Sequence, residues 1–382
     1  MITEREPRVA EPEAPPPPDP RRPRRSVGPA ALVAAVLIAA LVGGAVAGGV
    51  TLAILARQAR TNQQVVDLNN HVTISASDAV TNVASRALPA VVSIVTGAAA
   101  NGVPLGGSGF LVTSDGYLVT AIPVVTGSSK LQVLVPGDAR AHLAHVVDFD
   151  CQAGFAVLKA DGVSGAPTLG FGDSGALKLG ETVIALGGRL QGTQVAPAVV
   201  SALNTGSQFP NPTDSAQVEA VSDSIQTSQR LLAGASGAPL LNVGGQVVGL
   251  LLPAPAGQPT TAVAAAMVQP GVQQIVSGGQ LAVAGPGARW TDVPSTLAAA
   301  LGKTMGAELS AVSAGGPAAL AGLKVGDVVT QVDEVKIDDG HPLALDLRSR
   351  FQPGQRVTVS YVRGSSTAQV QLTLESEHPS CT

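Results

Sequence analysis

The chain has 382 residues, of which 45% are hydrophobic and only 2% aromatic, and its formal net charge is −4 at pH 7. This length exceeds that of one ordinary domain and predicts two or three folded units. The slight negative charge provides no basic surface for a phosphate backbone, which argues against nucleic acid as a partner. With 44 Gly and 28 Pro, turns are frequent, and this composition favours many short strands over long helices.

Two segments precede the folded part of the chain. Residues 1–25 hold four consecutive prolines and mixed charges with few apolar side chains, which predicts a disordered tail. Residues 26–56 contain no charged side chain, and about 20 apolar residues suffice to cross a bilayer as a helix. Arginines concentrate at residues 21–25, before this run. The positive-inside rule therefore predicts a single-pass plasma (inner) membrane anchor, with a cytoplasmic N-terminus and extracytoplasmic domains.

A cleaved signal peptide is the alternative interpretation of residues 26–56. The sequence Ala45-Val46-Ala47 resembles a small-residue cleavage site. The apolar run is, however, longer than the roughly 7 to 15 residues usual for such a segment, which favours a retained helix. Gly44 and Gly48 form a GxxxG pattern that pairs membrane helices, although small-residue composition alone also explains it.

After a connector at 57–84, short apolar runs alternate with turn signals. Turn sequences such as SDG and PGD separate runs that fit strands, and these runs lie at 90–95, 109–112, 117–120, 131–135, 155–158 and 182–186. Many short strands at this spacing predict a mostly β fold, either a sandwich or a pair of barrels.

The order of the motifs resembles the HtrA (DegP-like) family of trypsin-like serine proteases. The stretches that carry the resemblance are GSGF at 107–110, DGYLVT at 115–120, FAVLK at 155–159, GDS at 172–174, LGE at 179–181, IQT at 225–227, GASGAPL at 234–240 and GQVVG at 245–249. The resemblance implies a trypsin-like double β-barrel at 85–278. It also implies a polypeptide as substrate or partner and assembly into a homotrimer.

The resemblance further assigns the positions of a catalytic triad. A serine nucleophile needs an imidazole as base and a carboxylate that orients the imidazole. The motifs place Ser236 at the nucleophile, but Pro123 stands where the family has its histidine and Gly154 stands where it has its aspartate. The N–H groups of Gly234 and Ser236 match the oxyanion hole. These positions predict a protease fold without an activated serine.

Two histidines of the protease-like region are candidates for the base that is missing at Pro123. His142 and His145 lie three residues apart in a strand-like segment, so their side chains are expected on opposite faces. We interpret them as surface residues of a strand.

A second domain, at 289–376, follows a linker at 279–288 and precedes a short tail at 377–382. The sequence GPAALAGLKVGDVV at 316–329 and a late strand at 353–361 resemble a small α+β PDZ domain. Such domains add an extended peptide to a sheet edge and hold its carboxylate with the N–H groups of a glycine-containing loop.

The PDZ resemblance puts the peptide-binding loop near Arg289. The candidate binding residues are Trp290, Thr291, Asp292 and Val293. This stretch lacks the glycine, and an aspartate here would repel a carboxylate. We interpret Trp290 as a core residue rather than a platform for a ligand.

Cys151 and Cys381 are the only cysteines. Outside the cytoplasm they could form a disulfide, and two free thiols are equally compatible with the sequence. Isolated cysteines and scattered histidines make no ligand cluster, so no metal is predicted. No glycine-rich phosphate loop precedes a helix, and no cofactor is expected.

Three functions fit these features. Pro123 and Gly154 favour a non-catalytic binding or regulatory pseudoprotease of the cell envelope. Ser236 and the overall resemblance favour an active serine endopeptidase of extracytoplasmic protein quality control, with a base from an unexpected residue or another subunit. Gly44, Gly48 and the pairing of domains favour a scaffold that assembles envelope complexes.

Overall fold

The structure is a computed structural model of the chain. It describes residues 76–98, 104–128, 130–188, 193–211, 218–229, 234–253, 260–379 and 381. The predicted tail at 1–25, the predicted span at 26–56 and most of the connector lie outside these residues. Within the described part of the chain, no helix is both long and apolar enough to cross a membrane.

The first half of the protease-like region forms a closed six-stranded barrel. Its strands are connected in the order β1-β2-β3-β6-β5-β4. The sequence accounts for the strands, since β4 alternates buried and exposed side chains and β6 is buried except at Lys159. The strands are β1 (Val91–Ala98), β2 (Pro104–Leu111), β3 (Tyr117–Ala121), β4 (Leu131–Leu134), β5 (Ala141–Asp150) and β6 (Phe155–Ala160).

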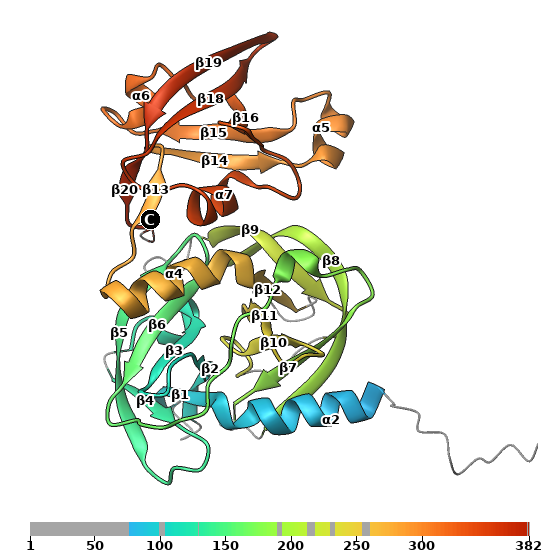
Figure 1. Cartoon of the computed structure of the whole chain (residues 1–382), viewed down its shortest axis with the longest axis vertical. Helices are drawn as coiled ribbons and strands as arrows, with labels where there is room; N and C mark the ends of the chain where they lie inside the picture. Colours follow the sequence, from blue (N-terminus) through green and yellow to red (C-terminus); the bar gives the residue numbers. More distant parts are fainter. Residues whose placement is uncertain are drawn as a thin grey trace, which may run out of the picture. The chain divides into compact units, whose positions relative to one another are not determined.

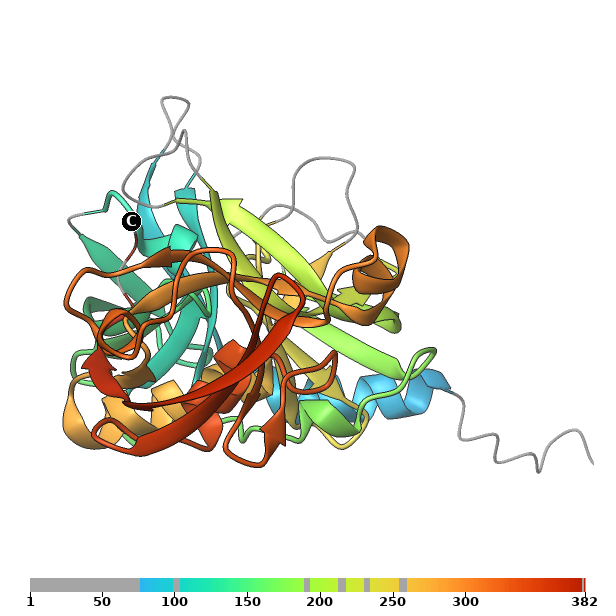
Figure 2. The same cartoon turned by 90° about the horizontal axis from the view of Figure 1, so that it is seen from above.

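A second closed barrel lies beside the first, with the strand order β10-β11-β12-β9-β8-β7 (Figures 1 and 2). The predicted trypsin-like double barrel is confirmed. The strands are β7 (Thr182–Gly187), β8 (Gln194–Pro210), β9 (Val218–Thr227), β10 (Pro239–Asn242), β11 (Val247–Leu251) and β12 (Thr261–Ala264).

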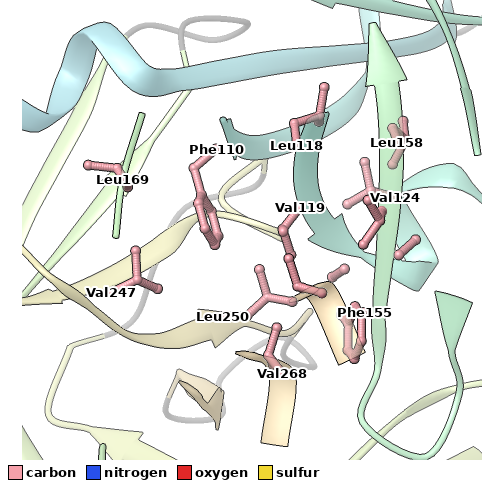
Figure 3. Close-up of a cluster of buried hydrophobic side chains, with 14 of the residues drawn as sticks. Phe110, Leu118, Val119, Val124, Phe155, Leu158, Leu169, Val247, Leu250 and Val268 are labelled. Atoms are coloured by element: carbon pink, nitrogen blue, oxygen red, sulfur yellow. The ribbon is translucent and has the colours of Figure 1, made fainter. Parts of the chain in front are cut away.

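One hydrophobic cluster joins the two barrels. Phe110 and Phe155 of the first barrel are fully buried and pack in the same cluster as Leu250 of the second barrel and Val268 of helix α4 (Figure 3). A chain so poor in aromatic residues thus places two of its few rings at the centre of this core. The helical segments of this region are α2 (Ala76–Ala87), η1 (Leu88–Ala90), α3 (Ile122–Val125), η2 (Ser174–Ala176) and α4 (Ala265–Gly278).

The C-terminal domain is a sheet with the strand order β14-β15-β16-β18-β19, to which β17 adds beside β16. A separate two-stranded sheet pairs β13 with β20, so the expected linker at 279–288 contains a strand. Its elements are β13 (Val283–Gly285), β14 (Ala288–Val293), α5 (Ser295–Leu301), β15 (Gly306–Val312), α6 (Pro317–Leu320), β16 (Val328–Val332), β17 (Val335–Lys336), α7 (Leu343–Ser349), β18 (Arg356–Arg363), β19 (Ser366–Thr373) and β20 (Glu375–Glu377).

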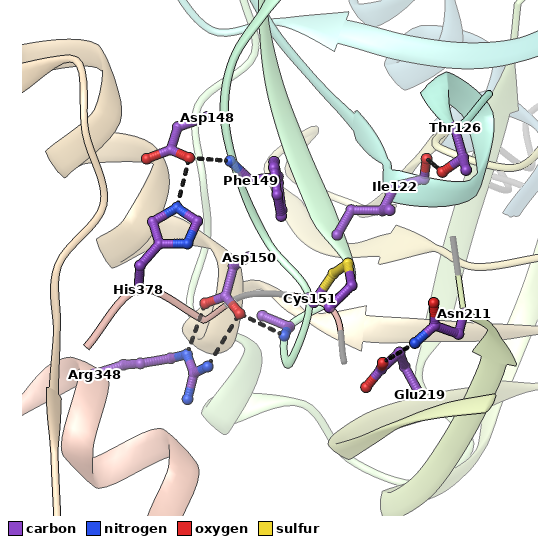
Figure 4. Close-up of a disulfide and its surroundings, with 12 residues drawn as sticks. Ile122, Thr126, Asp148, Phe149, Asp150, Cys151, Asn211, Glu219, Arg348 and His378 are labelled. Atoms are coloured by element: carbon purple, nitrogen blue, oxygen red, sulfur yellow. Dashed lines mark hydrogen bonds and ion pairs between the residues drawn. A yellow bond between two sulfur atoms is a disulfide. The ribbon is translucent and has the colours of Figure 1, made fainter. Parts of the chain in front are cut away.

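A buried ion pair joins helix α7 to the first barrel. The guanidinium of Arg348 donates from Nε to Asp150 Oδ2 at 3.0 Å and from Nη2 to Asp150 Oδ1 at 3.1 Å (Figure 4). The two side chains are only 3% and 1% exposed. Asp150 Oδ1 also accepts the Ala153 N–H at 2.9 Å. This two-pronged contact fixes both the position and the orientation of α7 against the barrel.

A disulfide makes a second connection, between the first barrel and the C-terminal tail. Cys151 pairs with Cys381, with their Cα atoms 5.1 Å apart, which lies within the usual range for a disulfide. Of the two possibilities that the sequence left open, the structure has the disulfide. The tail that carries Cys381 is further held because the Cys151 N–H donates to the Pro379 carbonyl at 2.9 Å.

We expect the Arg348→Met substitution to lower the free energy of unfolding by about 3 to 5 kcal/mol, because it leaves the Asp150 carboxylate buried without its cation. Urea unfolding of the purified chain at neutral pH measures this change. Arg140→Met is the matched control, since its side chain is 77% exposed in an ion pair with Asp138, and it should change stability by less than about 1 kcal/mol. Equal effects of the two substitutions would contradict the assignment.

Candidate active site

The turn that carries Ser236 lies between β9 and β10 and is anchored to the first barrel by Ser108. The Ser108 N–H donates to the Ser236 carbonyl at 2.9 Å, and the Ser108 hydroxyl donates to the Gly234 carbonyl at 2.7 Å. The same hydroxyl accepts the Gly188 N–H at 2.8 Å. Ser108 is fully buried. The sequence analysis gave this residue no role, although it lies inside the GSGF motif that carried part of the resemblance.

Positions 123 and 154 lie side by side, close to the Ser236 turn. The Ile122 N–H donates to the Gly154 carbonyl at 3.1 Å, which joins the start of α3 to the residue before β6. A side chain at Gly107 would contact both Val124, which follows Pro123, and the Ser236 carbonyl. The structure therefore brings together the three positions that the sequence analysis assigned to a triad.

Apolar side chains fill the space beside Gly154. Its backbone has a φ of +70°, a conformation that residues with a side chain rarely adopt. A Cβ atom at this position would lie 3.0 Å from a ring carbon of Phe209 and 3.2 Å from a methyl group of Leu252. Phe209 and Leu252 are themselves 1% and 3% exposed. The direction in which a carboxylate would extend from this backbone is thus occupied by hydrocarbon.

The hydroxyl of Ser236 is buried and has no hydrogen-bond partner among the described residues. The N–H groups of Gly234 and Ser236 likewise donate to no carbonyl in the part of the chain that the structure describes. Within the described residues, the Ser236 hydroxyl and the two N–H groups predicted to form an oxyanion hole thus have no hydrogen-bond partner.

His142 and His145 are engaged elsewhere on β5. The ring of His142 is buried, and its nitrogens lie 2.8 Å from the Asp161 carbonyl and 3.0 Å from the Asp138 carboxylate. His145 is exposed, with its ring 3.8 Å from the Asp161 carboxylate. The two rings differ in burial as expected for opposite faces, but the expectation that both lie on the surface was wrong for His142.

The predicted peptide-binding residues lie on β14, an edge strand of the C-terminal sheet. Thr291 is exposed and Val293 is buried. Trp290 packs against the hydrophobic clusters of both the barrels and the C-terminal domain, which agrees with its interpretation as a core residue. Burial raises the pKa of Asp292 to about 6, although the nearby Ser222 hydroxyl opposes the shift.

Comparison with known proteins agrees with the division into a double barrel and a C-terminal domain. The trypsin-like peptidase domain family matches residues 107–250, and the PDZ domain family matches residues 294–374. The chain is HtrA-like. Within its described residues, no group of three or more His, Cys, Asp or Glu side chains is placed to hold a metal ion.

The curated relatives of this HtrA-like chain include several endoproteases. It is 31% identical over 277 residues to a probable periplasmic serine endoprotease DegP-like of Chlamydia trachomatis, covering 70% of this chain and 53% of the relative. It is 28% identical to the periplasmic pH-dependent serine endoprotease DegQ of Escherichia coli, covering 70% and 59%. The chain thus spans about half the length of the curated relatives it matches.

Solved structures with this fold include the HtrA-type protease AlgW with a decapeptide. That likeness has a TM-score of 0.58 at 22% identity and covers 79% of this chain and 99% of AlgW. The serine endoprotease from Yersinia pestis gives a TM-score of 0.56 at 22% identity, with 78% and 98% covered. At this identity the likeness establishes the fold.

A second buried carboxyl belongs to Asp223, which follows Ser222 on strand β9. Burial raises the pKa of Asp223 to about 6 from an ordinary value of 3.8. The native state therefore holds this proton more tightly than the unfolded chain does. Stability should fall as the pH rises from about 4 to above 6, because the charged form is then forced into a buried site.

We expect Asp223→Asn to reduce this pH dependence, leaving the part that Asp292 contributes, and to stabilise the chain at pH 8 by about 1 to 3 kcal/mol, since each pKa unit corresponds to about 1.4 kcal/mol and an unpaired amide offsets part of the gain. Urea unfolding between pH 4 and pH 8 measures both effects. Asp161→Asn, at a side chain that is 62% exposed, is the control that should keep the slope. An unchanged slope in Asp223→Asn would contradict the assignment.

Proposed function

We propose that this HtrA-like chain is a non-catalytic pseudoprotease that binds polypeptides or regulates partner proteins in the cell envelope. The observation that carries the proposal is that apolar side chains fill the region beside Gly154. Phe209 and Leu252 occupy the direction in which the orienting carboxylate of a triad would extend. Pro123, which has no titratable group, stands beside it, so Ser236 lacks both partners that a trypsin-like serine needs.

The size of the expected loss follows from known triads. Removing the members of a triad costs about a millionfold in turnover, or roughly 8 kcal/mol of transition-state stabilisation. Oxyanion donors at Gly234 and Ser236 would leave only a residual rate. The PDZ domain is the retained part that contacts polypeptides without cleaving them.

Membrane attachment through residues 26–56, extracytoplasmic placement of both domains and assembly into a trimer belong to the same proposal. The charge asymmetry around the apolar run supports the orientation. The DegP-like and DegQ relatives are named as periplasmic endoproteases, which supports an extracytoplasmic location. Trimer assembly rests on the family resemblance alone.

An active serine endopeptidase is the second candidate function. The endoprotease names of the curated relatives favour it, together with the intact Gly-Ala-Ser-Gly turn at 234–237. It would require a base from a neighbouring subunit or from a residue outside the described part of the chain.

A fluorophosphonate probe separates the two functions, because it labels only an activated serine. We expect no labelling that depends on Ser236 and no casein cleavage above that of the Ser236→Ala variant, with an active trypsin-like protease labelled in parallel. Labelling that disappears in Ser236→Ala would reject the pseudoprotease proposal.

Restoring the two missing side chains should not restore the enzyme. In the double variant Pro123→His with Gly154→Asp, the new aspartate must enter a left-handed backbone conformation and displace Phe209. We therefore expect fluorophosphonate labelling to stay at the level of the Ser236→Ala variant. Labelling of the double variant, with a circular dichroism spectrum like that of the parent, would show that the site still accommodates a triad.

A further inference from the structure

The C-terminal tail returns to the loop that precedes β14. Strand β20 pairs antiparallel with β13, with Glu377 opposite Val283 and Glu375 opposite Gly285. From this strand, Glu377 Oε1 accepts the Gly287 N–H at 2.6 Å. A strand from the tail and a carboxylate from the same strand are thus both bound next to the start of β14.

The loop at 285–287 is shaped around this carboxylate. A side chain at Gly285 would collide with the carboxyl group of Glu377. Pro286 has no N–H to donate, so Gly287 supplies the N–H donor at the tip of the loop. Burial, with a smaller contribution from the neighbouring Glu375, keeps the pKa of Glu377 above its ordinary value, although the Gly287 N–H and Arg348 oppose this shift. The Gly287 N–H contacts the carboxylate from the loop, and Arg348 of α7 lines the same small cavity as Glu377.

These contacts share one element with the way in which a PDZ domain holds a polypeptide, namely a carboxylate on a backbone N–H group, whereas the tail strand pairs with β13 and not with the edge of β14. Such domains bind an added strand at a sheet edge and hold its terminal carboxylate on backbone N–H groups. Strand β14 is an edge strand of its sheet, so one of its two sides is free of strand pairing. Trp290 of β14 and Leu347 of α7 line a small cavity together with Glu377, Pro379 and the barrel residue Gln152. Residues of β14, α7, the tail and the barrel thus meet at this cavity.

Covalent and polar contacts hold the tail in this position. His378 Nε2 lies 2.7 Å from Asp148 Oδ1, and its ring packs edge-on against Phe149 (Figure 4). The Cys151–Cys381 disulfide closes the arrangement four residues after Glu377. Because only three residues lie between Glu377 and Cys381, the disulfide keeps this end of the tail near the first barrel and limits how far Glu377 can move from Gly287.

We propose that the C-terminal tail is an internal ligand of the PDZ domain, in which the Glu377 side chain replaces the terminal carboxylate of a bound polypeptide and the Cys151–Cys381 disulfide locks the site. A dithiol reductant unlocks it: two electrons and two protons pass to the cystine, Cys151 and Cys381 become thiols, and the reductant becomes a disulfide. The released loop at 285–287 then binds polypeptides with a free C-terminal carboxylate. This inference rests on the proposed polypeptide-binding function, but not on the state of Ser236.

Hydrogen exchange at the Gly287 N–H tests the lock without any ligand. In the full chain we expect slow exchange with the disulfide intact and at least tenfold faster exchange after reduction by dithiothreitol or in the Cys151→Ser, Cys381→Ser variant. Glu377→Gln should speed exchange with the disulfide intact. Glu334→Gln, the same change at an exposed turn of this domain, is the matched control and should leave the rate unchanged. A rate unaffected by both reduction and Glu377→Gln would overturn the proposal.

Peptide capture tests the released site. The probe is a pool of random heptapeptides with free C-terminal carboxylates, compared with the same pool carrying C-terminal amides. We expect the reduced full chain to retain the carboxylate pool at least tenfold over the amide pool, and the oxidised chain to show no preference. Equal preference in both redox states, or none in the reduced chain and in oxidised Glu377→Gln, would overturn the proposal. Fluorophosphonate labelling of Ser236 would reject the proposed function and leave these results standing.

Discussion

The buried ion pair between Asp150 and Arg348 fixes the relation between the barrels and the PDZ domain. Two charges taken out of water gain little net stability over an apolar contact of the same size, but either one alone is costly, so the pair permits only one arrangement of α7 on the barrel. Asp150 also accepts the Ala153 N–H, and Cys151 follows it in sequence. The short segment 148–154 therefore holds α7, the tail and the backbone of Gly154 at once. In the family this segment leads to the aspartate of the triad. Here it serves as the attachment point of the C-terminal domain.

Much of the fold could be predicted from local sequence, and the positions of the candidate site followed from the order of motifs. The run FAVLK at 155–159 is a strand because its apolar side chains are buried between β3 and β5. Pro123, Gly154 and Ser236 lie close together because the barrel brings α3, β6 and the 234–237 turn to one place. The order of motifs could not show what fills the vacated space, since Phe209 comes from the end of the long strand β8, far from the motifs of the first barrel.

The contacts that hold the tail can hardly be predicted from the local sequence around each residue. Asp150 and Arg348 are 198 residues apart in sequence, and Cys151 and Cys381 are 230 apart. Single charged residues on a helix and a turn look like ordinary solvated side chains until the fold buries them. The presence of only two cysteines was the one hint, and it was equally compatible with free thiols. The peptide-binding loop was expected near Arg289, in a stretch that lacks the usual glycine, whereas the N–H of Gly287 meets the carboxylate of Glu377, a contact that only the return of the tail creates.

The serine turn has a structural reason to persist even without catalysis. The carbonyls of Gly234 and Ser236 are the acceptors of the buried Ser108, and Ser108 in turn accepts the Gly188 N–H. Losing this turn would leave a buried hydroxyl and a buried N–H without partners, at about 1 to 3 kcal/mol for each group. The requirement falls on the backbone and on the small size of the side chains, and not on the Ser236 hydroxyl, which has no partner among the described residues. The packing of the two barrels therefore requires this turn, whatever the state of the Ser236 hydroxyl.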